Sequence, residues 1–350
     1  MNSKLRYYFI CLVAISGLLF SCSEEPDSYL DTSTKGKGVF VVNEGNFTFS
    51  NSSLSFYDPE SKKILNDVFY SASGFPIGDA LQSMTIIDSA GYLCVSNSGK
   101  VLVFSINTFK HLATIGGLGA PRNIVQLEKN KAYISDLWNP YLTIINPETN
   151  TVTGKVELGS SSENMIESNG LVFISSWSYN NKIFVVDPEN DRLIDSIEVI
   201  KQPNSMVIDR DSKLWVLSDG GYKGSPYGQD TAGLIRIDPV SRKIERKLNF
   251  GNPDYSPGNL SINPSGDSLY FINGSIFRMG IYDEAIPVVA IIESSARNFY
   301  SLGIDPASGE IYVGDSKDFL STGQIYRYSS RIIPLDTFTA GIIPGSYCFK

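Results

Sequence analysis

The chain has 350 residues, of which 42% are hydrophobic and 12% aromatic, so it holds enough apolar material for a sizeable core. Its 37 acidic and 29 basic residues give a formal net charge of −8, which argues against a nucleic-acid partner because phosphate binding needs a basic face. The 30 glycines, 17 prolines and 19 tyrosines favour turns and strands over helices.

The N-terminal segment is typical of an export signal. Lys4 and Arg6 precede an apolar run over residues 8–20 that is too short for a permanent membrane span. Residues 19–22 resemble a bacterial lipobox, and segment 23–27, which holds three acidic residues, resembles a Bacteroidetes surface-export signal. We therefore expect a signal peptide over 1–21, an acylated Cys22, and a tether over 22–37 that anchors the protein on the outer membrane, facing the cell surface. Ordinary signal cleavage beside an incidental cysteine is the alternative.

A turn followed by Ser or Asn and an apolar run recurs seven times. The in-register residues, called the Ser/Asn ring below, are Ser83, Asn123, Asn164, Ser205, Asn259, Ser301 and Ser346. Successive copies lie 40 to 54 residues apart, and the longest spacing indicates a grown loop in the fifth unit. Each unit also repeats four short apolar runs; in the third these are 123–127, 131–134, 141–145 and 151–158. Four short strands per repeat of this length predict the blade of a β-propeller.

The two ends of the chain indicate how the array closes. The first unit begins at Gly38 without a first strand of its own, and residues 345–350 match the missing pattern. Pairing of that last strand with the first unit removes the exposed sheet edge of an open array. A solenoid, the competing architecture, needs polar capping repeats instead. The sequence therefore predicts an all-β, seven-bladed β-propeller over residues 38–350, as one domain closed by the C-terminal strand.

Candidate binding residues lie in the loops that differ between units, because function on a regular scaffold is carried by its loops. Aromatic rings beside Asn, Ser and Gly suit recognition surfaces, although such rings also cover blade edges. The predicted ligand-binding residues are Asn46, Phe47, Arg122, Trp138, Tyr141, Trp177, Tyr179, Tyr222, Tyr227 and Phe319. The Ser/Asn ring itself is interpreted as packing and turn chemistry, with Arg122 and Glu163 pointing to the channel mouth.

Catalytic and metal-binding constellations are not found in the sequence. The single histidine, His111, is expected at an outer blade edge without a catalytic partner. Cys94 and Cys348 lie in apolar strand patterns and are interpreted as buried thiols, with a disulfide between them as the alternative. The Asp-Pro pairs at Asp58, Asp187, Asp238 and Asp305 indicate turns. We therefore expect no enzyme activity, no metal and no required cofactor.

The opening residues 38–46, the segment 52–59 and the closing residues 341–345 resemble the YncE-like propeller group of Bacteroidetes surface proteins. Within that group the chain looks most like the BtuG lipoproteins. The resemblance implies capture of vitamin B12 (cobalamin and related corrinoids) and transfer to a TonB-dependent, BtuB-like outer-membrane transporter. The alternatives are a surface scaffold that binds a protein, glycan or haem partner and, less favoured, a propeller lyase or lactonase.

Overall fold

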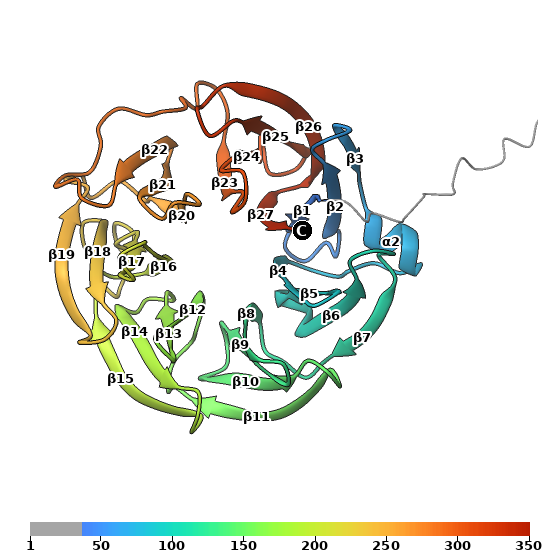
Figure 1. The fold of residues 1–350 in the computed structure, drawn as a ribbon, viewed down its shortest axis with the longest axis horizontal. Coiled ribbons are helices and arrows are strands. Elements are labelled where there is room, and N and C mark those ends of the chain that lie inside the picture. Colours follow the sequence, from blue (N-terminus) through green and yellow to red (C-terminus); the bar gives the residue numbers. More distant parts are fainter. Residues whose placement is uncertain (1–36) are drawn as a thin grey trace, which may run out of the picture.

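The computed structural model describes residues 37–350; the expected signal peptide, Cys22 and nearly all of the tether lie outside the described residues. Seven antiparallel sheets stand around a central opening, and consecutive strands of each sheet run from the centre outward (Figure 1). The prediction of an all-β, seven-bladed propeller is confirmed.

Among residues 37–350, six blades have four strands. From the centre outward, blade 1 consists of β27 (Pro344–Phe349), β1 (Val39–Asn43), β2 (Ser53–Asp58) and β3 (Lys63–Leu65), and blade 2 of β4 (Leu81–Ile87), β5 (Ala90–Val95), β6 (Lys100–Ser105) and β7 (His111–Ile115). Blade 3 consists of β8 (Pro121–Glu128), β9 (Lys131–Asp136), β10 (Tyr141–Asn146) and β11 (Thr151–Glu157), and blade 4 of β12 (Met165–Ser168), β13 (Leu171–Ser176), β14 (Lys182–Asp187) and β15 (Arg192–Glu198). Blade 5 consists of β16 (Pro203–Ile208), β17 (Leu214–Ser218), β18 (Gly233–Asp238) and β19 (Lys243–Asn249), and blade 7 of β23 (Phe299–Ile304), β24 (Ile311–Asp315), β25 (Thr322–Tyr328) and β26 (Pro334–Ile342).

Blade 6 departs from the pattern because it has three strands, β20 (Gly258–Ile262), β21 (Ser268–Asn273) and β22 (Ser275–Gly280). The expectation of four strands in every unit is therefore wrong for this blade. Segment 281–298 takes the outer position and meets β22 in a single bridge, between Ile276 and Ile292. The Asp283 carboxylate accepts a hydrogen bond from the Gly280 amide, which closes a turn directly after β22, and Pro287 cannot donate to a strand ladder.

Two short helical segments interrupt the strands, and neither was expected. The α-helix α2 (Val68–Ser73) buries Val68 and Phe69 beside the first two blades and ends at Gly74, where φ is 78°. The 3₁₀ turn η1 (Ser96–Ser98) joins β5 to β6. Within residues 37–350, no helix combines the length and the apolar character that a membrane crossing requires.

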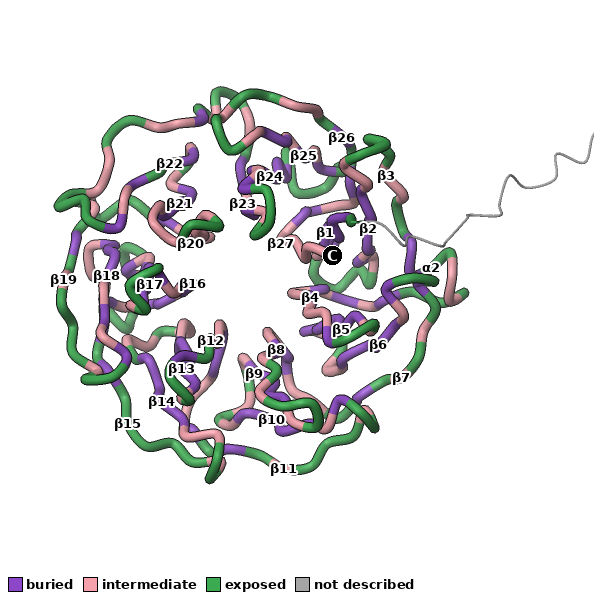
Figure 2. The backbone as a smooth tube through the Cα atoms, viewed as in Figure 1, coloured by how far each residue is buried: buried purple, intermediate pink, exposed green. Residues whose placement is uncertain are grey.

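The apolar core is divided among the blade interfaces. Buried apolar side chains of the described chain form seven clusters, each between two neighbouring blades. Between blades 1 and 2, for example, Phe40 packs edge-on against Phe104 with ring centroids 5.8 Å apart. Burial is highest in the two middle strands of the four-stranded blades, most innermost strands are half-buried, and the outermost strands are the most exposed (Figure 2). Each blade is therefore stabilised mainly by its two neighbours.

Closure of the ring follows the predicted topology. Strand β27 pairs antiparallel with β1, from Val39 opposite Phe349 to Asn43 opposite Pro344. The Lys350 amide then donates to the Gly38 carbonyl at 2.8 Å. The last strand of the chain is thus the innermost strand of blade 1, as the sequence indicated.

Candidate functional site

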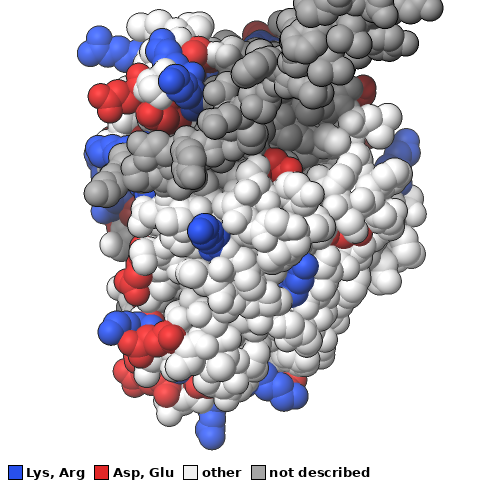
Figure 3. Space-filling view, turned by 90° about the vertical axis from the view of Figure 1, so that its right-hand side faces the viewer, with Lys and Arg blue, Asp and Glu red and all other residues white. Residues whose placement is uncertain are grey.

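The two faces of the disk differ in composition. The loop face is the one at which the first strand of each blade begins and the second strand ends; the turn face is opposite. The Asp-Pro residues lie at the turn face, where Asp58, Asp187, Asp238 and Asp305 each accept the amide of the residue two positions on. In side view, charged side chains gather along the left edge of the disk and the rest of the visible surface is mostly uncharged (Figure 3).

The Ser/Asn ring ties neighbouring blades together at the loop face. Ser83 donates to the Arg122 carbonyl of the next blade, Asn123 to the Glu163 carbonyl, and Asn259 to the Tyr300 carbonyl. Ser301 and Ser346 continue the pattern: their hydroxyls donate to the backbone carbonyls of Pro344 and Gln82. These side chains satisfy backbone acceptors across blade boundaries, which agrees with a structural role and holds the channel wall rigid.

Below the loop face the channel opens into a cavity of ≈ 520 Å³. All seven blades contribute to its wall, largely through the ring residues and the residue before each of them. Arg122 and Glu163 belong to this wall, as predicted. Arg122 donates through Nε and Nη2 to Glu163 Oε1, at 2.7 and 2.6 Å, and through Nη1 to Gln82 Oε1 at 2.5 Å. One guanidinium therefore joins blades 2, 3 and 4.

Glu44 faces this group from blade 1. Its Oε2 accepts a hydrogen bond from the Tyr300 hydroxyl at 3.1 Å. Burial raises the pKa of Glu44 to about 7, although the Tyr300 bond and the Arg122 charge act in the opposite direction. Gly345 packs against this carboxylate so closely that an added Cβ would lie 2.2 Å from Glu44 Oε1. A small residue at position 345 is thus required to seat the Glu44 side chain.

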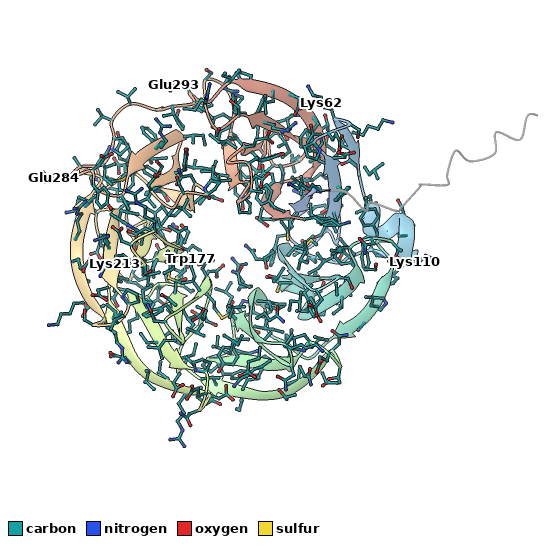
Figure 4. The ribbon with its side chains drawn as sticks, viewed as in Figure 1. Lys62, Lys110, Trp177, Lys213, Glu284 and Glu293 are labelled. Carbon is teal, nitrogen blue, oxygen red and sulfur yellow. The ribbon has the colours of Figure 1, made fainter. Side chains whose placement is uncertain are left out.

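Trp177 and Asp219 form the opposite part of the wall, from blades 4 and 5. The Trp177 indole N–H donates to Asp219 Oδ2 at 2.9 Å, and the Gly221 amide donates to Oδ1 at 2.8 Å. Desolvation raises the pKa of Asp219 above its usual value. Figure 4 shows Trp177 at the inner rim, whereas Lys110 and Glu293 lie toward the outside. The indole is thereby fixed beside a carboxylate in the cavity.

Most other predicted aromatics lie in the connections at the loop face, outside the cavity wall. Tyr179 and Tyr227 stack across blades 4 and 5, with ring centroids 4.5 Å apart. On the far side Asn46 donates to the Phe319 carbonyl, and the Phe319 ring lies edge-on to Tyr300. Phe47, Trp138 and Tyr222 project into solvent and are 64%, 61% and 52% exposed.

Of the ten predicted site residues, Arg122 and Trp177 belong to the cavity wall and the other eight lie outside it, including Tyr141. Its ring lies under the Lys155 ammonium, 4.9 Å from the centroid, at the start of the third strand of blade 3. Glu44, Asp219 and Tyr300 were not among the predicted site residues. Tyr300 occupies the register position of Arg122 and Glu163, immediately before the ring residue, and this position was the available signal.

No group of three or more His, Cys, Asp or Glu side chains in residues 37–350 is arranged to hold a metal ion. His111 begins β7, the outer strand of blade 2, and its Nε2 lies 2.8 Å from the Thr114 hydroxyl. Cys94 and Cys348 are free thiols in different core clusters, and burial raises the pKa of each to about 12. The outer-edge position of the histidine and the unpaired thiols agree with the sequence interpretation.

The fold and the cavity together define a seven-bladed propeller with a polar central pocket and an aromatic loop face. The family model described as Domain of unknown function (DUF5074) matches residues 37–331, and the chain belongs to this family. No curated protein matches the sequence significantly.

Solved structures with the same fold are distant in sequence. A quinonprotein alcohol dehydrogenase-like protein from Bacteroides thetaiotaomicron has a TM-score of 0.69 at 17% identity, over 91% of this chain and 78% of that one. A protein from Lactobacillus plantarum has a TM-score of 0.66 at 12% identity, over 90% and 99%. Dihydro-heme d1 dehydrogenase NirN, solved in complex with DHE, has a TM-score of 0.62 at 11% identity, over 92% and 76%. These similarities establish the fold alone.

Proposed function

We propose that this protein is a lipid-anchored surface protein that captures a corrinoid, such as vitamin B12, on its loop face and passes it to a TonB-dependent outer-membrane transporter. The observation that carries the proposal is the set of exposed aromatic rings at the loop face, the same side of the disk as the polar central cavity. Trp138, the stacked Tyr179 and Tyr227, and Phe47 come from four different blades.

The chemistry of the loop face matches that ligand class. A corrinoid is large and rigid, with apolar surfaces and a fringe of amides, and aromatic platforms beside Asn and Ser complement both parts. The inter-blade hydrogen bonds of the Ser/Asn ring hold the platforms in place before binding, which lowers the ordering cost of capture. No chemical step is needed for this role, so a cofactor is not required.

The position of Gly38 supports attachment through the turn face. Strand β1 runs from Val39 toward the loop face, so the chain enters the propeller at the opposite side. In our proposal the lipid on Cys22 holds this side through residues 23–37, which span roughly 50 Å when extended. That reach leaves the loop face free to turn toward a neighbouring transporter.

Titration of the soluble domain, from Asp31 to the C-terminus, with cyanocobalamin tests the proposal. We expect saturable binding, weakened at least tenfold by Trp138→Ala combined with Tyr179→Ala, since truncation of an aromatic hot spot that the ligand covers costs about 2 kcal/mol or more. Tyr70→Ala is the matched control, because Tyr70 is 50% exposed but lies on α2 at the rim of the disk. Absence of saturable binding at 0.1 mM ligand contradicts the proposal.

A protein-binding scaffold is the second candidate, since a face with exposed aromatic side chains also suits a protein partner. Pull-down of the transporter with and without cobalamin separates the two. Retention that does not depend on the ligand, together with no cobalamin binding by the isolated domain, favours the scaffold.

A further inference from the structure

The central cavity carries an excess of negative charge. Its wall contains three carboxylates, from Glu44, Glu163 and Asp219, and one cationic side chain, Arg122. The Arg122 guanidinium forms an ion pair with Glu163 and donates a hydrogen bond to Gln82. The guanidinium therefore neutralises one carboxylate and leaves Asp219 without a cationic partner in the wall, while the raised pKa of Glu44 lets that residue add a second negative charge only above about pH 7.

Glu163 supplies an independent sign of a missing ligand group. The residue is only 7% exposed, and both Arg122 contacts go to Oε1. Its Oε2 is buried and receives no hydrogen bond from any described residue. A buried carboxylate oxygen without a donor is costly. Glu163 lines the cavity and the terminal torsion of a glutamate is broad, so a donor group that enters the cavity can meet this carboxylate after a rotation about that torsion.

Two aromatic residues complete the wall beside the carboxylates. The hydrogen bond to Asp219 fixes Trp177, and the hydrogen bond to Glu44 fixes Tyr300. The faces of such rings attract cations, and the attraction grows in a site with little water. The charge of the wall and the acceptor without a donor thus favour a cationic guest, and the two aromatic residues add an attraction of the same sign wherever a ring face meets the guest.

We propose that the channel cavity is a binding site for the ammonium group of a small amine-bearing ligand, with Glu163 and Asp219 as its acceptors. The volume of ≈ 520 Å³ admits a molecule of the size of an amino sugar. This site goes beyond the proposed capture of a corrinoid, because it needs none of the exposed rings at the loop face.

Calorimetric titration of the full chain in detergent, with matched pairs of probes, tests this site. The pairs are glucosamine with glucose, and 1,4-diaminobutane with butane-1,4-diol. We expect at least one amine to bind saturably and at least tenfold more tightly than its neutral counterpart. Equal affinity within both pairs, or no binding of either amine at 10 mM, overturns the proposal.

Substitutions locate the site within the protein. Glu163→Gln and Asp219→Asn keep a hydrogen-bond acceptor but remove the charge, and each should weaken amine binding at least tenfold. Asp254→Asn is the control, since this exposed carboxylate lies in the loop before β20 and outside the cavity wall. Thermal unfolding verifies that each variant is folded. If both cavity variants bind amines like the unmodified protein, the assignment is wrong, whatever the outcome with cyanocobalamin.

Discussion

Glu44→Gln is the most informative single substitution, because it removes a charge and little else. Burial raises the pKa of Glu44 from 4.5 to about 7. Between these two pH values the folded protein holds a proton that the unfolded chain has lost, so the folded state loses stability as pH rises from about 4.5 to 7, and the loss levels off above 7. A shift of that size corresponds to about 3 kcal/mol, since one pKa unit is worth about 1.4 kcal/mol.

Glutamine keeps an oxygen that accepts the Tyr300 hydroxyl but cannot ionise. At pH 5 we expect the variant to match the unmodified protein within about 1 kcal/mol. At pH 8 it should be more stable by up to about 3 kcal/mol, or about 5 °C in Tm. Thermal unfolding at half-unit steps from pH 4.5 to 8.5 measures the difference. Parallel curves for the two proteins over that range would refute the assignment of a buried, neutral carboxyl to Glu44.

Three further predictions concern a buried ion pair within blade 7 and the contacts that join neighbouring blades. Arg327→Leu should lower the free energy of unfolding, measured by denaturant titration, by about 3 kcal/mol or more. The substitution removes the cation that the Glu310 and Asp336 carboxylates share, at 2.8 and 2.9 Å. Substitution of the exposed Arg331 by Leu is the control in the same titration. Ser301→Ala should cost about 1 kcal/mol by thermal unfolding, since the Pro344 carbonyl loses its donor, and unchanged stability would show that the bond contributes nothing. Deletion of residues 344–350 should abolish the soluble monomer seen by size exclusion; a stable monomer would mean that closure by β27 is dispensable.

The architecture could be predicted from the sequence because its signals are local and repeated. Each blade contributes one residue to the Ser/Asn ring. The Asp-Pro turns mark strand ends because the aspartate accepts a backbone amide two residues on, so a few consecutive residues are enough to encode them. The missing fourth strand of blade 6 was not predicted from the repeat. A turn closed by the Asp283 carboxylate directly after β22 leads the chain away from the position that a fourth strand occupies in the other blades. The helix α2 has no N-terminal side-chain cap and only six residues, too few for a clear helical period.

The cavity could be predicted only in part, because its essential contacts join residues that are distant in sequence. The positions of Arg122 and Glu163 followed from the repeat register. The hydrogen bond between Glu44 and Tyr300 joins residues 256 positions apart, and no local sequence pattern predicts it. The stacking of Tyr179 on Tyr227 likewise depends on the path of the long loop in blade 5. Register therefore places side chains on the wall, while tertiary structure decides which of them meet.

The pairing of β27 with β1 also constrains the order in which the protein can be completed. Residue 39 emerges from the ribosome early and must wait for residue 349, its partner in the ladder, before blade 1 is whole. Until then β1 presents an open edge to any other strand, and contacts so remote in sequence form slowly. We expect the newly made chain to be most vulnerable to proteases and to self-association in this interval. Pairing of residues 344–349 with β1 should end that vulnerability.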